Sequence, residues 1–233
     1  MRRRELAEPL AAQGVPRQGL AAAAAAVSPR QRPAKAAGQG AAPQQPARPP
    51  GSVRLIGGLY KRSKLQVPDS PGLRPTPDRV RETLFNWLGQ DLRGLRCLDA
   101  FAGTGALGLE AASRGAAAVR LLERDPALVQ ALRAQAQRLG AAQVQVQQAD
   151  ALAWMRSAAP GAWDVVFLDP PFSATAEAVQ VALAAARPLL AAGGLIYLEA
   201  PLPWSEAMLQ PLGLQVQRHG RAGQVHYHLL KPV

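Results

Sequence analysis

The chain has 233 residues, 48% of them hydrophobic, which is enough for one sizeable buried core but not for two independent ones. Its formal net charge of +11 favours a polyanionic partner and argues against an acidic, solvating protein. The lone Cys97 excludes an internal disulfide, and the sequence contains neither a zinc-binding cluster nor an apolar run of roughly 18 residues, so we expect a cytoplasmic protein without a metal or a membrane span.

Residues 1–50 form a basic tail that is rich in alanine and proline. They contain eight basic residues, two acids, eight prolines and no aromatic residue. Such a stretch buries too little apolar surface to offset the entropy lost on ordering, so disorder is predicted. A targeting segment and a nucleic-acid-binding arm are alternatives, but we favour an unselective tail.

Residues 51–92 are predicted to form a small module ahead of the main domain. Apolar and polar residues alternate over 53–67, with a diglycine at 57–58, and this pattern predicts a β-hairpin. The helix that follows is expected to be capped by Thr76 and to carry Pro77 in its first position.

Residues 93–233 are predicted to form the main domain, an α/β fold. Strands are expected at 95–100, 118–123, 143–148, 164–169 and 194–199, and helices at 105–114, 126–139, 151–157 and 174–190. Alternating strands and helices with short connections predict a doubly wound, mainly parallel sheet of the Rossmann type. Two alternating runs, at 212–219 and 224–230, predict a C-terminal antiparallel hairpin and bring the sheet to seven strands.

Acidic residues stand at the ends of these predicted strands. They are Asp99, Glu123, Asp150, Asp169 and Glu199. Helix capping explains any one of them. The carboxyl ends of parallel strands share one edge of a sheet, where ligands bind, so five acids there indicate a site for a ligand rich in hydroxyl and amine donors.

A glycine-rich loop, DAFAGTGALG, follows the first strand of the main domain. Gly103, Gly105 and Gly108 match the pattern GxGxxG, and Glu123 stands 20 residues after Gly103, where an acid can bind a ribose diol. The glycines let the backbone approach a ligand closely at the start of a helix. This loop alone fits a nicotinamide dinucleotide and S-adenosylmethionine equally well.

Two residues ahead of the glycines favour S-adenosylmethionine. Asp99 and Phe101 extend the motif to D-x-F-x-G-x-G. A carboxylate at position 99 would face the diphosphate of a dinucleotide unfavourably, but it suits the ammonium group of a methionine. Asp150 is predicted either to accept the adenine amino group or to cap the following helix, and both interpretations stay open.

The tetrapeptide Asp169-Pro170-Pro171-Phe172 ends the fourth strand of the main domain. Proline cannot continue a central strand and lacks a backbone donor, so both prolines are expected to turn their carbonyls outward as rigid acceptors. The side chain of Asp169 and the carbonyl of Pro170 can then accept from one planar amino group. The ring of Phe172 offers a face on which a flipped base stacks. A plain loop is the alternative.

D-x-F-x-G-x-G followed by DPPF resembles the class I methyltransferases that modify exocyclic amines of adenine or guanine. Residues 54–88, with RPT at 74–76, DRVRE at 78–82 and LFN at 84–86, are similar to the start of the RsmD-type 16S ribosomal RNA guanine-N2 methyltransferases. The resemblance covers about 53–231, and the long N-terminal extension departs from it.

This resemblance implies a Rossmann-like class I methyltransferase fold that uses S-adenosylmethionine. It implies methylation of N2 of guanine 966 in 16S rRNA, within the assembled small ribosomal subunit. The family's functional positions carry over as Asp99, Gly103 and Gly105 for the cofactor and residues 169–172 for the base. A monomer is expected.

A local excess of positive charge precedes the predicted site. Residues 51–83 hold seven basic residues and three acids. Beside such a site, they are predicted to clamp RNA phosphates, although a solvated face is the alternative. The expected RNA-binding residues are Arg54, Lys61, Arg62, Lys64 and Arg74. Whether Arg74 meets RNA or the methionine carboxylate stays open.

His226 and His228 project from one face of a predicted strand, and surface histidines are favoured there over a metal pair. Cys97 is expected to be buried and inert. Three competing functions remain: an adenine-N6 DNA methyltransferase, a nicotinamide-dependent oxidoreductase and a non-catalytic RNA-binding factor. A DNA enzyme needs a larger target-reading region, and an oxidoreductase leaves DPPF unexplained.

Overall fold

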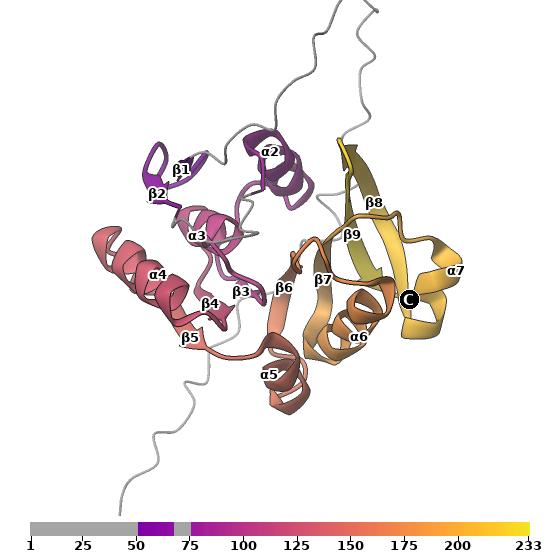
Figure 1. Cartoon of the computed structure of the whole chain (residues 1–233). Coiled ribbons are helices and arrows are strands. Elements are labelled where there is room, and N and C mark those ends of the chain that lie inside the picture. The colour runs from indigo at the N-terminus through magenta and orange to yellow at the C-terminus, as the bar shows by residue number, and fades with distance from the viewer. Residues whose placement is uncertain (1–50, 68–75) are drawn as a thin grey trace, which may run out of the picture.

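The computed structural model describes residues 51–67 and 76–233 (Figure 1). The predicted tail and Arg74 lie outside them. The strands are β1 (Ser52–Arg54), β2 (Lys64–Gln66), β3 (Arg96–Asp99), β4 (Ala118–Glu123), β5 (Val144–Gln148), β6 (Trp163–Leu168), β7 (Leu190–Ala200), β8 (Leu214–Ala222) and β9 (Val225–Pro232). The α-helices are α2 (Asp78–Trp87), α3 (Ala106–Ser113), α4 (Pro126–Arg138), α5 (Ala151–Ser157), α6 (Ala176–Ala186) and α7 (Glu206–Leu209). No helix among these residues is long and apolar enough to cross a membrane.

The main sheet has seven strands in the order β5-β4-β3-β6-β7-β9-β8. Strands β3 to β7 are parallel, and β9 joins β7 in antiparallel fashion. The predicted doubly wound sheet and its C-terminal hairpin are therefore confirmed. Winding reverses between β3 and β6, and such a switch point opens a crevice at the carboxyl ends of the two strands.

Two apolar layers enclose the sheet (Figure 1). Helices α2, α3 and α4 and the β1–β2 hairpin pack on one face, and α5, α6 and α7 pack on the other. Both faces are buried, which explains the near-continuous apolar runs of β3 and β6. Cys97 of β3 is fully buried, and burial raises the pKa of its thiol, as expected for an inert side chain.

The predicted N-terminal hairpin is observed: β1 pairs with β2 in antiparallel fashion, and Gly57 and Gly58 lie in the connection formed by residues 55–63. The predicted cap of the helix that follows is wrong. Helix α2 begins at Asp78 with Pro77 as its N-cap residue, and no side chain caps it. The Thr76 hydroxyl, expected to cap this helix, bonds elsewhere.

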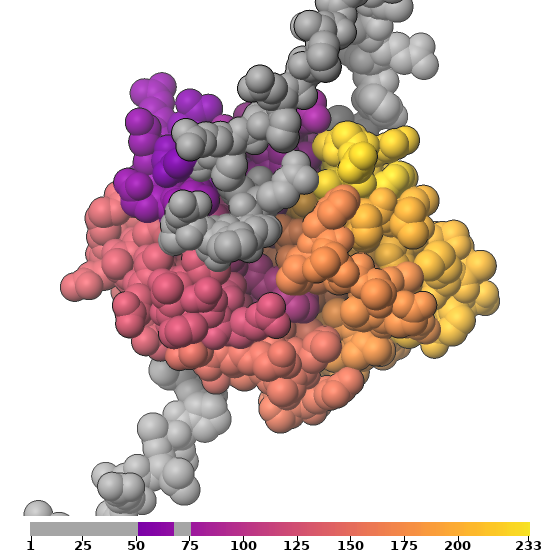
Figure 2. Space-filling model, in the orientation of Figure 1, coloured from indigo at the N-terminus to yellow at the C-terminus, as the bar shows by residue number. Residues whose placement is uncertain are grey.

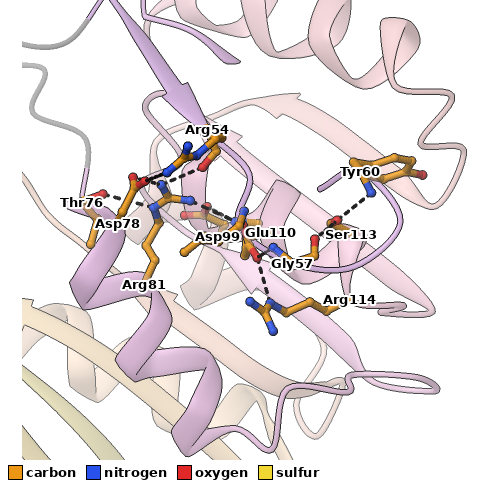
Figure 3. A network of polar contacts seen from close by, with 12 residues as sticks. Arg54, Gly57, Tyr60, Thr76, Asp78, Arg81, Asp99, Glu110, Ser113 and Arg114 are labelled. Carbon is orange, nitrogen blue, oxygen red and sulfur yellow. Dashed lines mark hydrogen bonds and ion pairs between the residues drawn. The ribbon is translucent and has the colours of Figure 1, made fainter. Parts of the chain in front are cut away.

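A buried arginine ties α2 to the hairpin (Figure 3). The Arg81 side chain has no exposed surface, and its guanidinium donates to Asp78 at 2.6 Å, to the carbonyl of Arg54 at 2.9 Å and to Glu110 at 3.4 Å. Its Nε also donates to the carbonyl of Thr76 at 3.2 Å. Arg81 is one of the seven basic residues in the predicted RNA clamp. Because its guanidinium is buried and bonded within the fold, it cannot contact RNA.

The carboxylate of Glu110, on α3, fixes the loop of the same hairpin (Figure 3). It accepts the backbone N–H groups of Ile56 and Gly57, each at 2.8 Å, and the Arg114 guanidinium at 2.8 Å. Gly58 adopts a φ of 71°, and a Cβ there would collide with the carbonyl of Ser113. The hairpin is therefore held against α3 by a charged, fully buried anchor.

Candidate active site

The carboxyl ends of the parallel strands bring the predicted acids to one edge of the sheet. Asp99 ends β3, Asp169 follows β6 and Glu199 lies near the end of β7. Cross-strand register aligns Asp99 with Phe167 and Phe167 with Tyr197. The edge beyond these three neighbouring strands is the candidate active site.

Asp99 carries an unsatisfied oxygen at this edge. Its side chain is buried, and Oδ2 accepts the N–H of Gly108 at 2.9 Å. Within residues 51–67 and 76–233, Oδ1 is buried without a hydrogen-bond partner. Burial raises the pKa of Asp99 to about 7, with the neighbouring charges of Glu123 and Glu199 adding to the effect and the N–H groups of Gly108 and Phe101 opposing it. This oxygen is placed to accept from a cation.

The glycine loop turns sharply between β3 and α3, and a Cβ at Gly105 would collide with the side chains of Leu132 and Leu109. Gly103 and Gly105 have φ values of 49° and 77°, in the left-handed region that favours glycine. Glu123 steadies the loop because its Oε2 accepts the Gly103 N–H at 3.0 Å, while Oε1 accepts the N–H groups of Arg124 and Asp125. The unpaired Asp99 oxygen beside this loop fits the ammonium group at the methionine end of S-adenosylmethionine.

The other predicted cofactor residues take up different positions along the edge. Phe101 is partly buried against the α5–α6 side of the core. Asp150 is exposed and caps α5, because its Oδ1 accepts the N–H of Ala153 at 2.9 Å. The capping interpretation is therefore observed, and a contact from Asp150 to adenine remains a prediction.

Thr76 is a site residue that the sequence analysis missed. It is buried, and its hydroxyl donates to Oδ2 of Asp169 at 3.3 Å across 93 positions of the chain. Burial raises the pKa of Asp169 well above its usual range. The charges of Glu199 and Asp99 add to this, and the Thr76 hydrogen bond opposes it. The RPT motif, which ends on Thr76, was the available signal.

Glu199 completes a cluster of carboxyl groups at the edge. It is buried, and its Oε1 accepts the Tyr197 hydroxyl at 2.8 Å. Burial raises the pKa of Glu199, while the hydrogen bond from Tyr197 opposes the rise. Three carboxyl groups with raised pKa values thus share one desolvated edge, which favours partial protonation in the free protein.

The DPPF segment lies beside this cluster. The carbonyl of Pro171 accepts the N–H of Ala174 at 2.7 Å and closes a turn. The expectation that both prolines offer outward carbonyls is therefore wrong for Pro171, and the Pro170 carbonyl is the candidate acceptor beside Asp169. The Phe172 ring is 48% exposed, as a stacking platform requires.

A cavity of about 320 Å³ adjoins Thr76, between the hairpin and the start of α2. Arg54 and Lys64 line it, and Arg54 forms an exposed ion pair with Asp78 at 3.2 Å. Lys61 and Arg62 are exposed in the connecting loop of the hairpin. Exposed pairs contribute little to stability, so Arg54 is free to exchange Asp78 for an anionic ligand at small cost.

The histidine prediction is wrong for His228, which is buried. Its Nε2 accepts the N–H of Trp204 at 3.1 Å, and its ring stacks on His219 with centroids 4.5 Å apart. Burial lowers the pKa of His228 to about 4. His219 also lies 3.1 Å from His226, measured from Nε2 to Nδ1. His219 was not predicted as part of this cluster because it lies on the partner strand, β8.

Comparisons with known proteins agree with this architecture. The chain matches the family model described as conserved hypothetical protein 95 over residues 53–231. It is 43% identical to the ribosomal RNA small subunit methyltransferase D of Escherichia coli K12 over 180 residues, which cover 77% of this chain and 89% of the relative. It is 38% identical to the protein of the same name from Haemophilus influenzae, over 77% of this chain and 93% of the relative.

Solved structures give the same result. The Escherichia coli protein yhhF, described as a candidate methyltransferase, superposes with a TM-score of 0.67 at 38% identity, over 78% of this chain and 98% of that one. A candidate methylase from Haemophilus influenzae superposes with a TM-score of 0.61 at 34% identity, over 78% and 99% of the two chains. The chain therefore belongs to the conserved hypothetical protein 95 family, the family of the RsmD-type methyltransferases.

Proposed function

We propose that this chain transfers a methyl group from S-adenosylmethionine to the exocyclic N2 amine of guanine 966 in 16S rRNA, within the assembled small subunit. The main support is that hydrogen-bond acceptors for the cofactor and for the target amine lie at the ends of two neighbouring strands, β3 and β6. The unpaired Asp99 oxygen lies at the glycine loop, and Asp169 with the Pro170 carbonyl lies beside it. Similarity to ribosomal RNA small subunit methyltransferases supports the substrate class.

Different residues along the sheet edge contact different parts of the cofactor. Asp99 accepts from the methionine ammonium, Glu123 from the ribose hydroxyls and Asp150 from the adenine amine, while Gly103 and Gly105 admit the ligand. The bound cofactor supplies an electrophilic sulfonium methyl group. Buried carboxylates favour a cationic ligand by direct charge attraction, which is stronger in a desolvated site.

Asp169 and Pro170 act on the target amine. Thr76 occupies Oδ2 of Asp169, which leaves Oδ1 and the Pro170 carbonyl to accept the two amine hydrogens. These two acceptors fix the orientation of the amine and keep its lone pair available for bond formation. Asp169 then takes up the proton that the methylated amine releases. Its raised pKa makes it a better proton acceptor than an ordinary carboxylate.

Thr76→Val is expected to move the pH dependence of turnover. Asp169 must be ionised to accept, so activity rises with pH through its pKa. The Thr76 hydrogen bond lowers that pKa, so its loss raises the pKa further and moves the acidic limb of the kcat profile to higher pH. Thr76→Ser keeps the hydroxyl and serves as the matched control. Superimposable profiles for the Val and Ser variants would remove Thr76 from the site.

The proposed function is tested with small subunits that lack the modification and a cofactor labelled on its methyl group. Label in N2 of guanine 966, located by nuclease digestion and mass spectrometry, is the expected result. Label in an adenine amine would replace the proposal with adenine-N6 chemistry. Cofactor binding without any transfer would indicate a non-catalytic RNA-binding factor.

A further inference from the structure

The C-terminal hairpin, formed by β8 and β9, carries a basic surface with no assigned role. Residues 214–233 contain Arg218, Arg221, Lys231 and all three histidines of the chain, and they contain no acid. The rest of the candidate site is acidic, so this concentration of positive charge and imidazole nitrogen is local.

Strand register places the tip of this hairpin at the active edge of the sheet. Strand β9 runs antiparallel to β7, with Glu199 opposite Tyr227 and Ala200 opposite His226. β7 ends at Ala200, so residues 222–225 extend past it on the side where Glu199 lies. The tip therefore overhangs the edge that carries the catalytic carboxyl groups.

One face of the tip presents Arg221 and His219 together. Arg221 lies opposite His226, and His219 lies opposite His228, so these side chains share a face. The other face carries Gly220, whose Cβ would collide with the Tyr227 ring. Two contacts order the polar face. Arg221 donates through Nε to the carbonyl of Gly223 at 2.9 Å, and the His219 and His226 rings are parallel within 1°.

The hairpin tip and the β1–β2 hairpin lie on opposite sides of the site. β8 and β9 form one end of the sheet order, whereas the β1–β2 hairpin contacts α4 through the bond from Arg138 to the Lys64 carbonyl at 2.7 Å. In Figure 2 the indigo and yellow surfaces flank the same face of the molecule. The carboxyl groups between them repel phosphates, so a bound RNA strand needs cationic contacts on both flanks.

We infer that the β8–β9 tip is a second phosphate-binding surface, which holds the rRNA backbone on the far side of the target guanine from the β1–β2 hairpin. The inference rests on the proposed function. Arg221 supplies the charge, and the exposed imidazole of His219, whose Nε2 faces His226, offers its Nδ1–H as a second donor. Backbone recognition is favoured over base recognition because an exposed guanidinium and an exposed imidazole pair readily with phosphate oxygens.

The test compares Arg221→Gln with Lys231→Gln in the full-length chain. Both variants remove one exposed positive charge from the same hairpin, but Lys231 lies at its opposite end. Dissociation constants for unmodified small subunits are measured over a series of salt concentrations. Arg221→Gln is expected to weaken binding and to reduce the slope of log K against log salt by about 1, one phosphate contact, with kcat unchanged at saturation. Lys231→Gln is expected to match the wild type.

A crosslinking measurement identifies the partner. Cys97 is buried and unreactive, so Gln224→Cys at the exposed turn gives a single site for a photoreactive label. Adducts with 16S rRNA are expected, and adducts with ribosomal proteins alone would overturn the inference. Equal affinity and equal salt slope for Arg221→Gln and Lys231→Gln would also overturn the inference. If the wild-type protein still methylated the subunits, the proposed function would be unaffected by that result. Failure of the wild type to methylate any subunit would overturn both.

Discussion

Replacing Asp169 by alanine is expected to lower methyl transfer by at least about 10²–10³-fold, while S-adenosylmethionine still binds. The variant loses the acceptor that orients the target amine and receives its proton. The residues proposed to hold the cofactor lie on β3, β4, the glycine loop and the start of α5, and they are untouched. Single-turnover transfer to unmodified small subunits measures the first effect, and calorimetric titration with the cofactor measures the second.

The variant Asp169→Asn separates two roles of this residue: accepting a hydrogen bond from the target amine and taking up its proton. The amide oxygen of asparagine still accepts one amine hydrogen, so this variant should retain more activity than the alanine variant and lose the acidic limb of its pH profile. Glu177→Ala is the matched control, because it removes an exposed acid on α6 that lies outside the proposed site. Near-normal turnover of Asp169→Ala would exclude Asp169 from the mechanism.

Glu110→Ala is expected to lower the free energy of unfolding by about 3–5 kcal/mol, the usual effect of breaking a buried ion pair. The Arg81 guanidinium would keep its exposed-side partner Asp78 but lose its buried one. The N–H groups of Ile56 and Gly57 would lose their acceptor as well. Urea denaturation followed by circular dichroism measures the change, and proteolysis of the β1–β2 hairpin should accelerate in parallel.

Two further variants make this result specific. Asp91→Ala removes one partner of the exposed Arg93–Asp91 pair and should leave the unfolding midpoint unchanged. The double variant Arg81→Met with Glu110→Leu removes both buried charges but still leaves the N–H groups of Ile56 and Gly57 without their acceptor, so it should recover only part of the lost stability. A Glu110→Ala protein as stable as Asp91→Ala would show that the network is not an anchor.

The sequence was sufficient for the sheet, its winding and the acids along its edge. Each of these depends on a local pattern, such as a continuous apolar run that ends in Asp99 or Asp169. The helix α7 was not predicted, because four residues are too few for a periodic pattern to emerge. Strand β7 starts at Leu190, not at residue 194 as predicted. The prediction was late because the Gly193-Gly194 pair is typical of a turn, although both residues lie within the strand.

Long-range partners explain the remaining differences. Thr76 before Pro77 and Asp78 fits a helix cap equally well, and only the fold brings its hydroxyl to Asp169. Arg81 counts as a basic residue in any local sum of charge, yet Glu110 neutralises it from another helix. His219 and His228 meet across two strands whose register includes a bulge between Val216 and Arg218, which spacing along one strand does not reveal.

The unpaired oxygen of Asp99 has a consequence for how the protein meets its cofactor. A carboxyl group with a pKa of about 7 is divided between its protonated and ionised forms near neutral pH. In the proposed function only the ionised form attracts the methionine ammonium, so each binding event displaces whatever proton the group holds. Protons and cofactor therefore compete for one oxygen atom, and acidification of the solution acts on this site as a competitive inhibitor.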